Sequence, residues 1–473
     1  MIADAVRKRY VPTVGIECHV QLKTKTKLFA AVGNDAREAP PNTLISHICV
    51  GMPGALPVLN EGAIDLSARA AFALGTRPQA FSKFERKHYF YPDLPKGYQI
   101  TQYEDPIIKG GFVEIKTEDG LRKIEIERAN LEEDAGKNTH PAGADYSLVD
   151  LNRAGTPLLE IVSKPDIHSP ADAKAFAKEL YILMRYADVT DGDLYHGHVR
   201  FDVNTSVSKD GEKFGTRSEV KNLNSFRSVE KAVAYEIDRQ IELLEKGQKI
   251  IQETRGWDEA KQKTTSLRSK EEAQDYRYMP EPDVPPVELS DQAISKIKEQ
   301  MPELPNDLRQ RLSKIDIDPK VIEDILDRPE LVPAILEASG QTSPENARRV
   351  VFQLLEAPEA ASINVKDQIT IAEMVAAGEL SSTAAKEVSK ENLKFGKNPN
   401  EIAKKLDLLQ VSDESAIDKI VAEVLTENPK ATQDVKNGEM KAIGFLTGQV
   451  MAKSKGQANP ALAQKLIRKQ LGL

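Results

Sequence analysis

The stretch FVEIKTEDGLRKIEIE, residues 112–127, carries the clearest fold signal in this chain. Apolar and polar side chains alternate on both sides of Asp119-Gly120, a dipeptide typical of a two-residue hairpin turn. The stretch therefore predicts two antiparallel strands joined by a tight turn. HVRFDVNTSVS, residues 198–208, alternates in the same way and predicts a further strand.

Helical patterns interrupt these strands. Ser169-Pro170 predicts the start of one helix, because serine can cap free N–H groups and proline fits the first turn. Ser225 predicts the start of another, whose apolar residues recur at helical spacing up to Gly247. Because hairpins and helices are mixed in this order, the fold class that we predict for this part is α+β.

The distribution of aromatic residues divides the chain. All twelve tyrosines and the single tryptophan lie at or before Tyr278, and the proline-rich stretch MPEPDVPPVEL, residues 279–289, follows directly. We therefore predict a first domain over residues 1–292. Amphipathic segments separated by turns predict an all-α domain over residues 293–398 and a second helical unit over residues 399–473.

Composition limits the class of protein. A chain of 473 residues is too long for one ordinary core, and its net charge of −8 argues against a generally basic nucleic-acid coat, although a local basic patch stays open. The chain has only two cysteines, Cys18 and Cys49, which fits a protein of the reducing cytoplasm. A single disulfide between them is the alternative. We find no apolar run of membrane-spanning length and no signal-peptide pattern, so we expect a cytoplasmic protein.

The strand VGIECHVQL, residues 14–22, is the first candidate for chemistry. Alternate side chains of a strand share a face, so Glu17 and His19 point one way. A neighbouring carboxylate and imidazole can bind a divalent metal ion. They can equally form a hydrogen-bonded structural pair.

Further acids strengthen the metal interpretation. Glu132 lies in LEEDAGK after the hairpin, and Glu160 lies inside the apolar stretch LLEIVS. A buried carboxylate needs a cation or hydrogen-bond donors, and Mg²⁺ typically takes one or two carboxylates while sharing substrate phosphates. We therefore predict a Mg²⁺ site from Glu17, His19, Glu132 and Glu160. For Glu160 the alternative is an ordinary salt bridge to Lys or Arg.

Polar residues elsewhere indicate a phosphate-bearing substrate. Asp202 and Asn204 share one strand face, and Lys221 lies near a helix entrance, where N–H groups favour anions. The stretch RKHYFYPDLPKGYQITQY, residues 86–103, offers tyrosines for stacking and lysines for phosphate, or else forms an aromatic cluster that closes a sheet edge. The sequence contains neither a glycine-rich phosphate loop nor a G-x-S-x-G nucleophile motif. The residues alone thus predict metal-dependent phosphate chemistry.

The last 43 residues are basic. Residues 431–473 carry seven Lys or Arg against two acids, a net charge of +5. KSKGQANP, residues 453–460, is a basic turn between two predicted helices. A solvated helix face is the plain interpretation of these lysines, and contact with a nucleic-acid backbone is the functional one.

Eight long blocks, in order along the chain, resemble the B component of glutamyl/aspartyl-tRNA amidotransferase, the GatB family. They are VGIECHVQLKTKTKLF, YFYPDLPKGYQITQYEDPI, NLEEDAGKNTH, SLVDLNRAGTPLLEIVSKPDI, EVKNLNSFRSVEKAV, QETRGWDE, DYRYMPEPDVPP and KNGEMKAIGFLTGQVMAKSKGQANP. The resemblance implies a glutamine-synthetase-like cradle domain, an all-α helical domain and a YqeY-like helical tail.

The resemblance also implies an activity and partners. An amidase-type A subunit would release ammonia from glutamine, and a small C subunit would complete a heterotrimer. This chain would use ATP and Mg²⁺ to phosphorylate the side-chain carboxylate of Glu on tRNA-Gln, or of Asp on tRNA-Asn, before ammonia displaces phosphate. Two other classes stay open, a non-enzymatic tRNA-binding scaffold with this fold and an amide ligase for a small metabolite.

Residues follow from the matching motifs. The resemblance implies a metal site made by Glu17, His19, Glu160 and one acid after the hairpin, either Glu132 or its neighbour Glu133. It also implies that the loop within residues 86–103 lines the active pocket. The predicted catalytic residues are therefore Glu17, His19, Glu132, Glu160 and Lys87, the substrate-binding residues are Tyr91, Lys96, Tyr98, Asp202, Asn204 and Lys221, and the tRNA-binding residues are Lys453 and Lys455.

Three departures from the family pattern matter. Many relatives carry C-x-C followed by C-x-x-C, whereas this chain keeps only Cys49, with Ser46 at its partner's position. One thiol cannot build a tetrahedral site, so we expect no structural zinc. Asn130 stands where the family usually has His, and His88 stands where it often has Asn.

Overall fold

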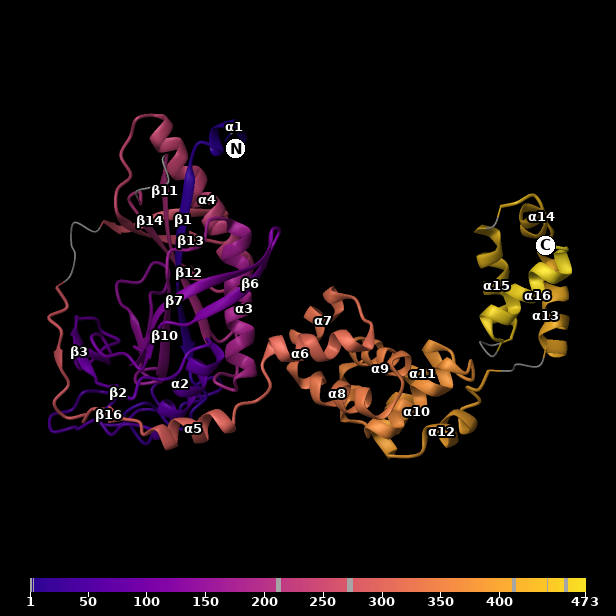
Figure 1. Cartoon of the computed structure of the whole chain (residues 1–473), viewed down its shortest axis with the longest axis horizontal. Coiled ribbons are helices and arrows are strands. Elements are labelled where there is room, and N and C mark those ends of the chain that lie inside the picture. Colours follow the sequence, from indigo (N-terminus) through magenta and orange to yellow (C-terminus); the bar gives the residue numbers. More distant parts are fainter. Residues whose placement is uncertain are drawn as a thin grey trace. The chain divides into compact units, whose positions relative to one another are not determined.

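The computed structural model describes residue 2 and residues 4–209, 214–269, 275–410, 414–439, 441–454 and 458–473. The chain forms two compact units, Met1–Pro305 and Asn306–Leu473. Figure 1 colours them from indigo to salmon and from salmon to yellow. The domain boundaries that the sequence predicts after residues 292 and 398 remain predictions.

A mixed sheet organises the first unit. Within the described residues, nine strands belong to it, in the order β14-β13-β12-β11-β1-β10-β7-β5 with β6 on β7. Neighbouring strands are antiparallel except β12 and β13. The strands are β1 Val11–Gln21, β5 Ile108–Lys109, β6 Phe112–Thr117, β7 Gly120–Glu133, β10 Pro157–Ser163, β11 Val199–Ser208, β12 Ser218–Leu223, β13 Glu253–Asp258 and β14 Lys263–Ser269.

The strands predicted at residues 14–22, 112–127 and 198–208 are confirmed, with one change in the turn. Thr117 pairs with Gly120, so the two loop residues are Glu118 and Asp119 rather than Asp119-Gly120. Gly120 opens β7 with φ +116°, a conformation that only glycine adopts readily. β7 then continues to Glu133, so the two glutamates of LEEDAGK, Glu132 and Glu133, lie within the strand.

Two helices cover one face of this sheet, and both begin where the sequence predicts. Ser169 caps α3 (Pro170–Tyr186) by accepting from the N–H of Asp172, and Ser225 caps α4 (Phe226–Glu245) by accepting from the N–H of Ser228. Both helices pack on the central strands (Figure 1). Their apolar stripes bury the inward side chains of β1, namely Ile16, Cys18 and Val20. Cys18 and Cys49 are both buried and unpaired.

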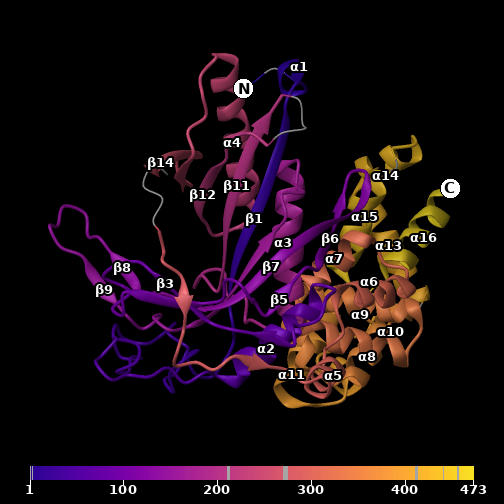
Figure 2. The same cartoon turned by 60° about the vertical axis from the view of Figure 1, so that its left-hand side comes forward.

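The opposite face of the sheet meets a small three-stranded sheet. β3 (Glu85–His88) pairs with β4 (Tyr98–Thr101) and with β15 (Met279–Pro280). In Figures 1 and 2, β3 lies on the side of the main sheet away from α3. The stretch 86–103 is therefore a short hairpin with a loop at residues 89–97, neither a helix nor a long strand. Other elements of this unit are α1 Asp4–Arg7, α2 Glu61–Ala73, α5 Asp291–Glu299, β2 Phe81–Ser82, β8 Lys137–Thr139, β9 Leu148–Asp150 and β16 Val287–Glu288.

Helices alone form the regular structure of the described part of Asn306–Leu473, as the amphipathic pattern predicts. One apolar core joins α10, α11 and α12, and another joins α13 to α16. The α-helices are α6 Pro305–Leu312, α7 Pro319–Leu326, α8 Val332–Gln341, α9 Pro344–Glu356, α10 Val365–Ala376, α11 Ser382–Phe395, α12 Pro399–Lys405, α13 Glu414–Glu427, α14 Pro429–Lys436, α15 Lys441–Lys453 and α16 Pro460–Leu471, with 3-10 turns at Ser313–Ile315, Pro329–Leu331 and Pro358–Ser362. Among the described residues, no helix combines the length and apolarity needed to cross a membrane.

Two adjacent glycines allow a matched test of the fold. A Cβ at Gly111 (φ +106°) would lie 2.6 Å from the carbonyl oxygen of Leu74, whereas one at Gly110 (φ +72°) would meet no atom within 4 Å. We expect Gly111→Ala to lower the unfolding temperature of the unit Met1–Pro305 by at least about 4 °C more than Gly110→Ala does. The reason is that only Gly111→Ala forces a backbone shift. Differential scanning calorimetry of both variants measures this, and equal transitions would contradict the close approach.

Candidate functional site

The open face of the main sheet gathers charged residues from four strands. On β1, Glu17 pairs in register with Asp202 of β11, and His19 pairs with Glu160 of β10. Glu160 in turn pairs with Asn130 of β7. Residues that lie far apart in the sequence therefore meet in one row across the sheet, because antiparallel partners in register point to the same face.

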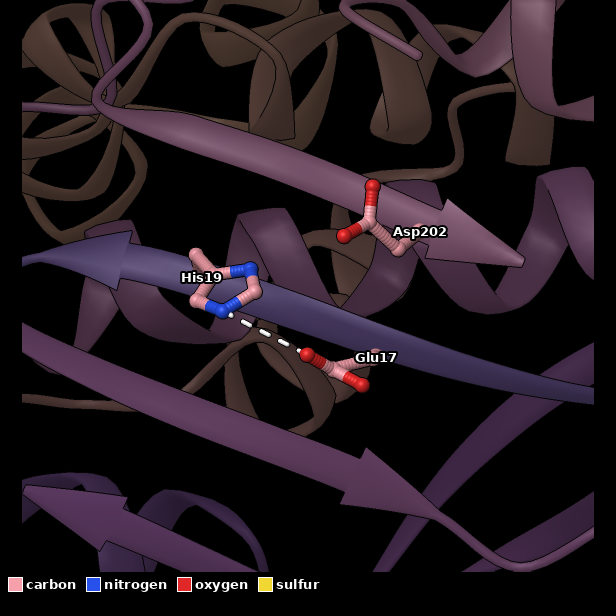
Figure 3. A group of neighbouring side chains, drawn as sticks. All are labelled: Glu17, His19 and Asp202. Carbon is pink, nitrogen blue, oxygen red and sulfur yellow. Dashed lines mark ion pairs between the residues drawn. The ribbon is translucent and has the colours of Figure 1, made fainter. Parts of the chain in front are cut away.

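Three of these side chains form a candidate metal cluster. Glu17, His19 and Asp202 each offer a ligand atom, and these atoms lie within 4.8 Å of one another (Figure 3). His19 Nε2 is 3.4 Å from Glu17 Oε1 and 4.0 Å from Glu132 Oε1. The structure thus places Asp202, which we predicted among the substrate-binding residues, beside two of the predicted metal ligands.

The charges of the cluster are poorly balanced by protein groups. Burial, followed by the charges of Glu160 and Asp202, raises the pKa of Glu17 to about 9. Burial and the charge of Glu160 raise the pKa of Glu132 to about 8. Both shifts show that the anionic form is unfavourable here without further positive charge, which a divalent cation would supply.

The donor set fits Mg²⁺. Carboxylate oxygens are its usual protein ligands, and burial lowers the pKa of His19, which leaves a neutral imidazole able to bind or support a cation. Asn130 Nδ2 donates to Glu160 Oε2 at 3.2 Å. Asn130 Oδ1 is buried and has no hydrogen-bond partner among the described residues, so it can accept from a metal-bound water.

Two lysines flank the carboxylates from opposite ends of the row. Lys221 Nζ is 2.8 Å from Asp202 Oδ2 and 3.2 Å from Glu219 Oε1. Burial opposes the charge of Lys87, but Glu132 and Glu160 outweigh burial and raise the pKa of this lysine. Both ammonium groups are therefore charged at neutral pH, and that of Lys221 is paired with two carboxylates of the protein.

The structure separates Glu132 from its neighbour Glu133. Glu132 faces the cluster and accepts from Thr101 Oγ1 at 2.8 Å. Glu133 points the other way, where it accepts from the N–H of Ile100 and forms an ion pair with Lys96. Of the two acids that the motif left open, Glu132 is the one beside the cluster, and Lys96 is engaged away from it.

The remaining predicted residues belong to both units of the chain. Asn204 lines a cavity of about 580 Å³ together with Glu17 and Arg217. Tyr98 is half-buried under the guanidinium of Arg86, whose Cζ is 4.4 Å from the ring centroid, and Tyr91 is 51% exposed. In the second unit, Lys453 forms ion pairs with Glu423 and Glu427, and Lys455 lies outside the described residues.

Tertiary pairing adds residues that the sequence analysis did not single out. Tyr276 and Tyr278 precede β15, which pairs with β3 and carries them to the tyrosines of the 86–103 stretch. Lys87 Nζ lies 5.0 Å from the centroid of the Tyr276 ring. The block DYRYMP was the only signal in the sequence for this contact, and its partner lies nearly two hundred residues earlier in the chain.

Cys49 is in contact with a buried lysine. Lys27 Nζ lies 3.6 Å from Cys49 Sγ and donates to the carbonyl oxygens of Leu44 and Ala154. Ser46 Oγ lies 3.4 Å from the same sulfur. The thiol that remains of the family's cysteine pattern is therefore surrounded by polar protein groups.

Comparison with known proteins decides the family. Residues 12–295 match the model described as the GatB/GatE catalytic domain, and residues 339–471 match the GatB domain. The chain belongs to the GatB family. The GatB/GatE match includes the cluster and both flanking lysines, and the GatB domain match includes Lys453.

Curated relatives share one name, the B component of aspartyl/glutamyl-tRNA(Asn/Gln) amidotransferase. The protein of that name from Thermodesulfovibrio yellowstonii is 45% identical, over 98% of this chain and 99% of its own length. Those from Bdellovibrio bacteriovorus and Thermotoga petrophila are 44% and 42% identical, with the same shares covered. GatB similarity thus extends along the whole chain.

The cluster predicts how substitutions change cation binding. We expect Glu17→Gln and Asp202→Asn each to weaken Mn²⁺ binding by at least about 10-fold, because each removes an anionic ligand. Electron paramagnetic resonance of free Mn²⁺ during titration measures the affinity. Glu127→Gln is the control, since Glu127 lines the same cavity and pairs with Arg128 instead. Equal affinities in all three variants would place the cation elsewhere.

Proposed function

We propose that this chain is the B component of a tRNA-dependent amidotransferase that converts Glu on tRNA-Gln, Asp on tRNA-Asn, or both, to the amide. The cluster of Glu17, His19 and Asp202 between two charged lysines carries this proposal. The names of the curated relatives support it. In this proposal the first unit is a glutamine-synthetase-like cradle, and the functional boundaries fall after residues 292 and 398.

The chemistry explains why charge must gather here. A carboxylate is a poor electrophile, so its oxygen first attacks the γ-phosphorus of ATP and ADP leaves. The nitrogen of ammonia then attacks the carbonyl carbon of this acyl phosphate, phosphate leaves with the carbon–oxygen bond electrons, and the nitrogen loses a proton. Both steps bring anionic groups together, and they need fixed positive charge in a site that excludes water.

Residues of this chain meet these needs. Glu17, His19 and Asp202, with Glu160 and Glu132 adjacent, would hold Mg²⁺, which when bound offsets charge on the transferring phosphoryl group. Lys87 and Lys221 would orient the phosphate oxygens from the two ends of the row. Asn204 and the cavity of about 580 Å³ beside Glu17 leave room for a nucleotide.

Partners follow from the same reaction. The described cluster holds no nucleophile suited to glutamine hydrolysis, so an amidase-type A subunit would supply ammonia, and a small C subunit would complete the heterotrimer. Tyr91, Lys96 and Tyr98 belong to the hairpin that would border the bound substrate. Such a complex acts on aminoacylated tRNA and belongs in the cytoplasm.

The decisive assay isolates the step of this chain. The heterotrimer with ATP, Mg²⁺ and Glu-charged tRNA-Gln receives ammonium chloride in place of glutamine, which bypasses glutamine hydrolysis. We expect conversion of esterified Glu to Gln, dependent on ATP, with a loss of at least about 100-fold in Glu17→Ala, because the variant lacks a cation ligand. Glu127→Gln serves again as the control.

A different outcome has a definite meaning. If the parent complex binds charged tRNA but converts none of it, the chain is a tRNA-binding scaffold with this fold. If it amidates a small carboxylic acid and ignores tRNA, the amide-ligase alternative holds.

The basic tail generates a separate prediction. Lys453 and Lys455 would contact the sugar-phosphate backbone of tRNA, and the ion pairs of Lys453 with Glu423 and Glu427 would exchange for phosphate contacts. We expect Lys453→Gln with Lys455→Gln to weaken tRNA binding and to reduce the slope of log affinity against log salt by about 2. Filter binding across salt concentrations measures it. An unchanged slope would make these lysines a solvated helix face.

A further inference from the structure

Five tyrosines from three separate segments form one continuous row. Tyr89 lies 6.2 Å from Tyr91 and 6.3 Å from Tyr276, Tyr276 lies 6.0 Å from Tyr278, and Tyr278 lies 4.2 Å from Tyr103, measured between ring centroids. We call this set the tyrosine row. Its members come from the β3–β4 loop, from the segment that follows β4 and from the segment before β15.

The row ends in a stacked pair that is open to solvent. The rings of Tyr103 and Tyr278 are nearly parallel, with 11° between their planes. Tyr103 is 51% exposed and Tyr278 is 37% exposed. A pair that served only to close the sheet edge would gain more by burying these faces. A parallel pair with an open face can instead be extended by another flat ring.

A strained arginine stands between two members of the row. Arg277 has φ +44°, which is unfavourable for a residue with a side chain. His88 holds it there, since the Nδ1 of His88 lies 3.0 Å from the Arg277 carbonyl oxygen and its backbone N–H donates to the Tyr276 carbonyl. The exposed guanidinium of Arg277 forms no ion pair with any described residue. Strain of this kind concentrates at ligand sites.

The row leads to the carboxylates of the candidate site. Tyr103 lies two residues beyond Thr101, whose hydroxyl donates to Glu132 at 2.8 Å. Lys87 lies over the Tyr276 ring and is kept charged by Glu132 and Glu160. The tyrosine row therefore borders open solvent at Tyr103 and Tyr278, and it borders the candidate site through Thr101 and Lys87.

We propose that the tyrosine row binds the unpaired 3′ end of the aminoacylated tRNA, with a terminal base stacked on the Tyr103–Tyr278 pair and a phosphate on Arg277. This inference rests on the proposed function. Single-stranded RNA is bound by aromatic faces that tolerate any base, combined with cations along the backbone. Stacking at the outer end of the row leaves the esterified amino acid to reach toward Glu132 and the cluster.

A fluorescent base tests the stacking directly. The heterotrimer is titrated into uncharged tRNA that carries 2-aminopurine in place of its last adenine, whose emission falls when it stacks. We expect strong quenching with the parent and with Tyr103→Phe, and none with Tyr103→Leu. Affinity falls by about 10-fold in Tyr103→Leu, within the range measured for one stacked base. Tyr195→Leu is the control, because Tyr195 is 93% exposed and contacts only His196 among ring partners in the described part of the chain.

Two further measurements distinguish a role of the tyrosine row in RNA binding from a purely structural role. Tyr103→Leu should bind a tRNA trimmed of its unpaired 3′ end as well as the parent does. Arg277→Gly should keep the thermal transition of the parent, because glycine adopts φ +44° without strain, and it should reduce the salt slope of tRNA binding by about 1.

Three results would overturn the proposal. They are quenching that survives in Tyr103→Leu, equal loss of affinity for the trimmed tRNA, and recovery of fluorescence on adding ATP, which would make the row a site for the adenine of ATP. The variant Glu17→Gln separates this proposal from the proposed function, because it lacks an anionic cation ligand but keeps every member of the tyrosine row. Quenching without conversion in the parent would leave the row standing while the amidation activity fails.

Discussion

Repulsion among carboxylates on one face of the sheet is the constraint on which the site depends. The register of β1 places Glu17 against Asp202 and His19 against Glu160, and Glu132 adds a further acid. Helices α3 and α4 bury the other face, so slipping β1 by one residue would turn Glu17 and His19 into the apolar core. The fold therefore holds together negative charges that a divalent cation would compensate.

A second constraint comes from the chain that returns to this face. β15 pairs with β3 nearly two hundred residues away and carries Tyr276, Arg277 and Tyr278 to the hairpin. This pairing brings Lys87 under an aromatic ring and forms the stacked pair with Tyr103. The candidate metal cluster and the tyrosine row are thus linked through Lys87 and Thr101, and in our proposals this surface combines phosphate chemistry with recognition of an RNA end.

Local patterns predicted much of this structure because their physical causes are local. Serine caps, period-two alternation and the helical spacing after residue 225 depend on neighbours a few residues away, and the elements they predict are confirmed. The hairpin turn was misplaced by one residue, because Gly120 supplies its positive φ at the first strand position instead of within the loop. The choice between Glu132 and Glu133 could not be made locally, since it depends on which face of β7 meets β1 and β10.

By itself the sequence determined the α+β class of the first unit, the helices of the second and the family. It also determined that Glu17, His19 and Glu160 stand on apolar strands. Only the tertiary structure decided that Asp202 joins Glu17 and His19, that Glu133 engages Lys96, and that tyrosines from three segments form one row. The physical reason is distance along the chain. Alternation fixes the face of a residue within its own strand, whereas strand order and register decide which faces meet.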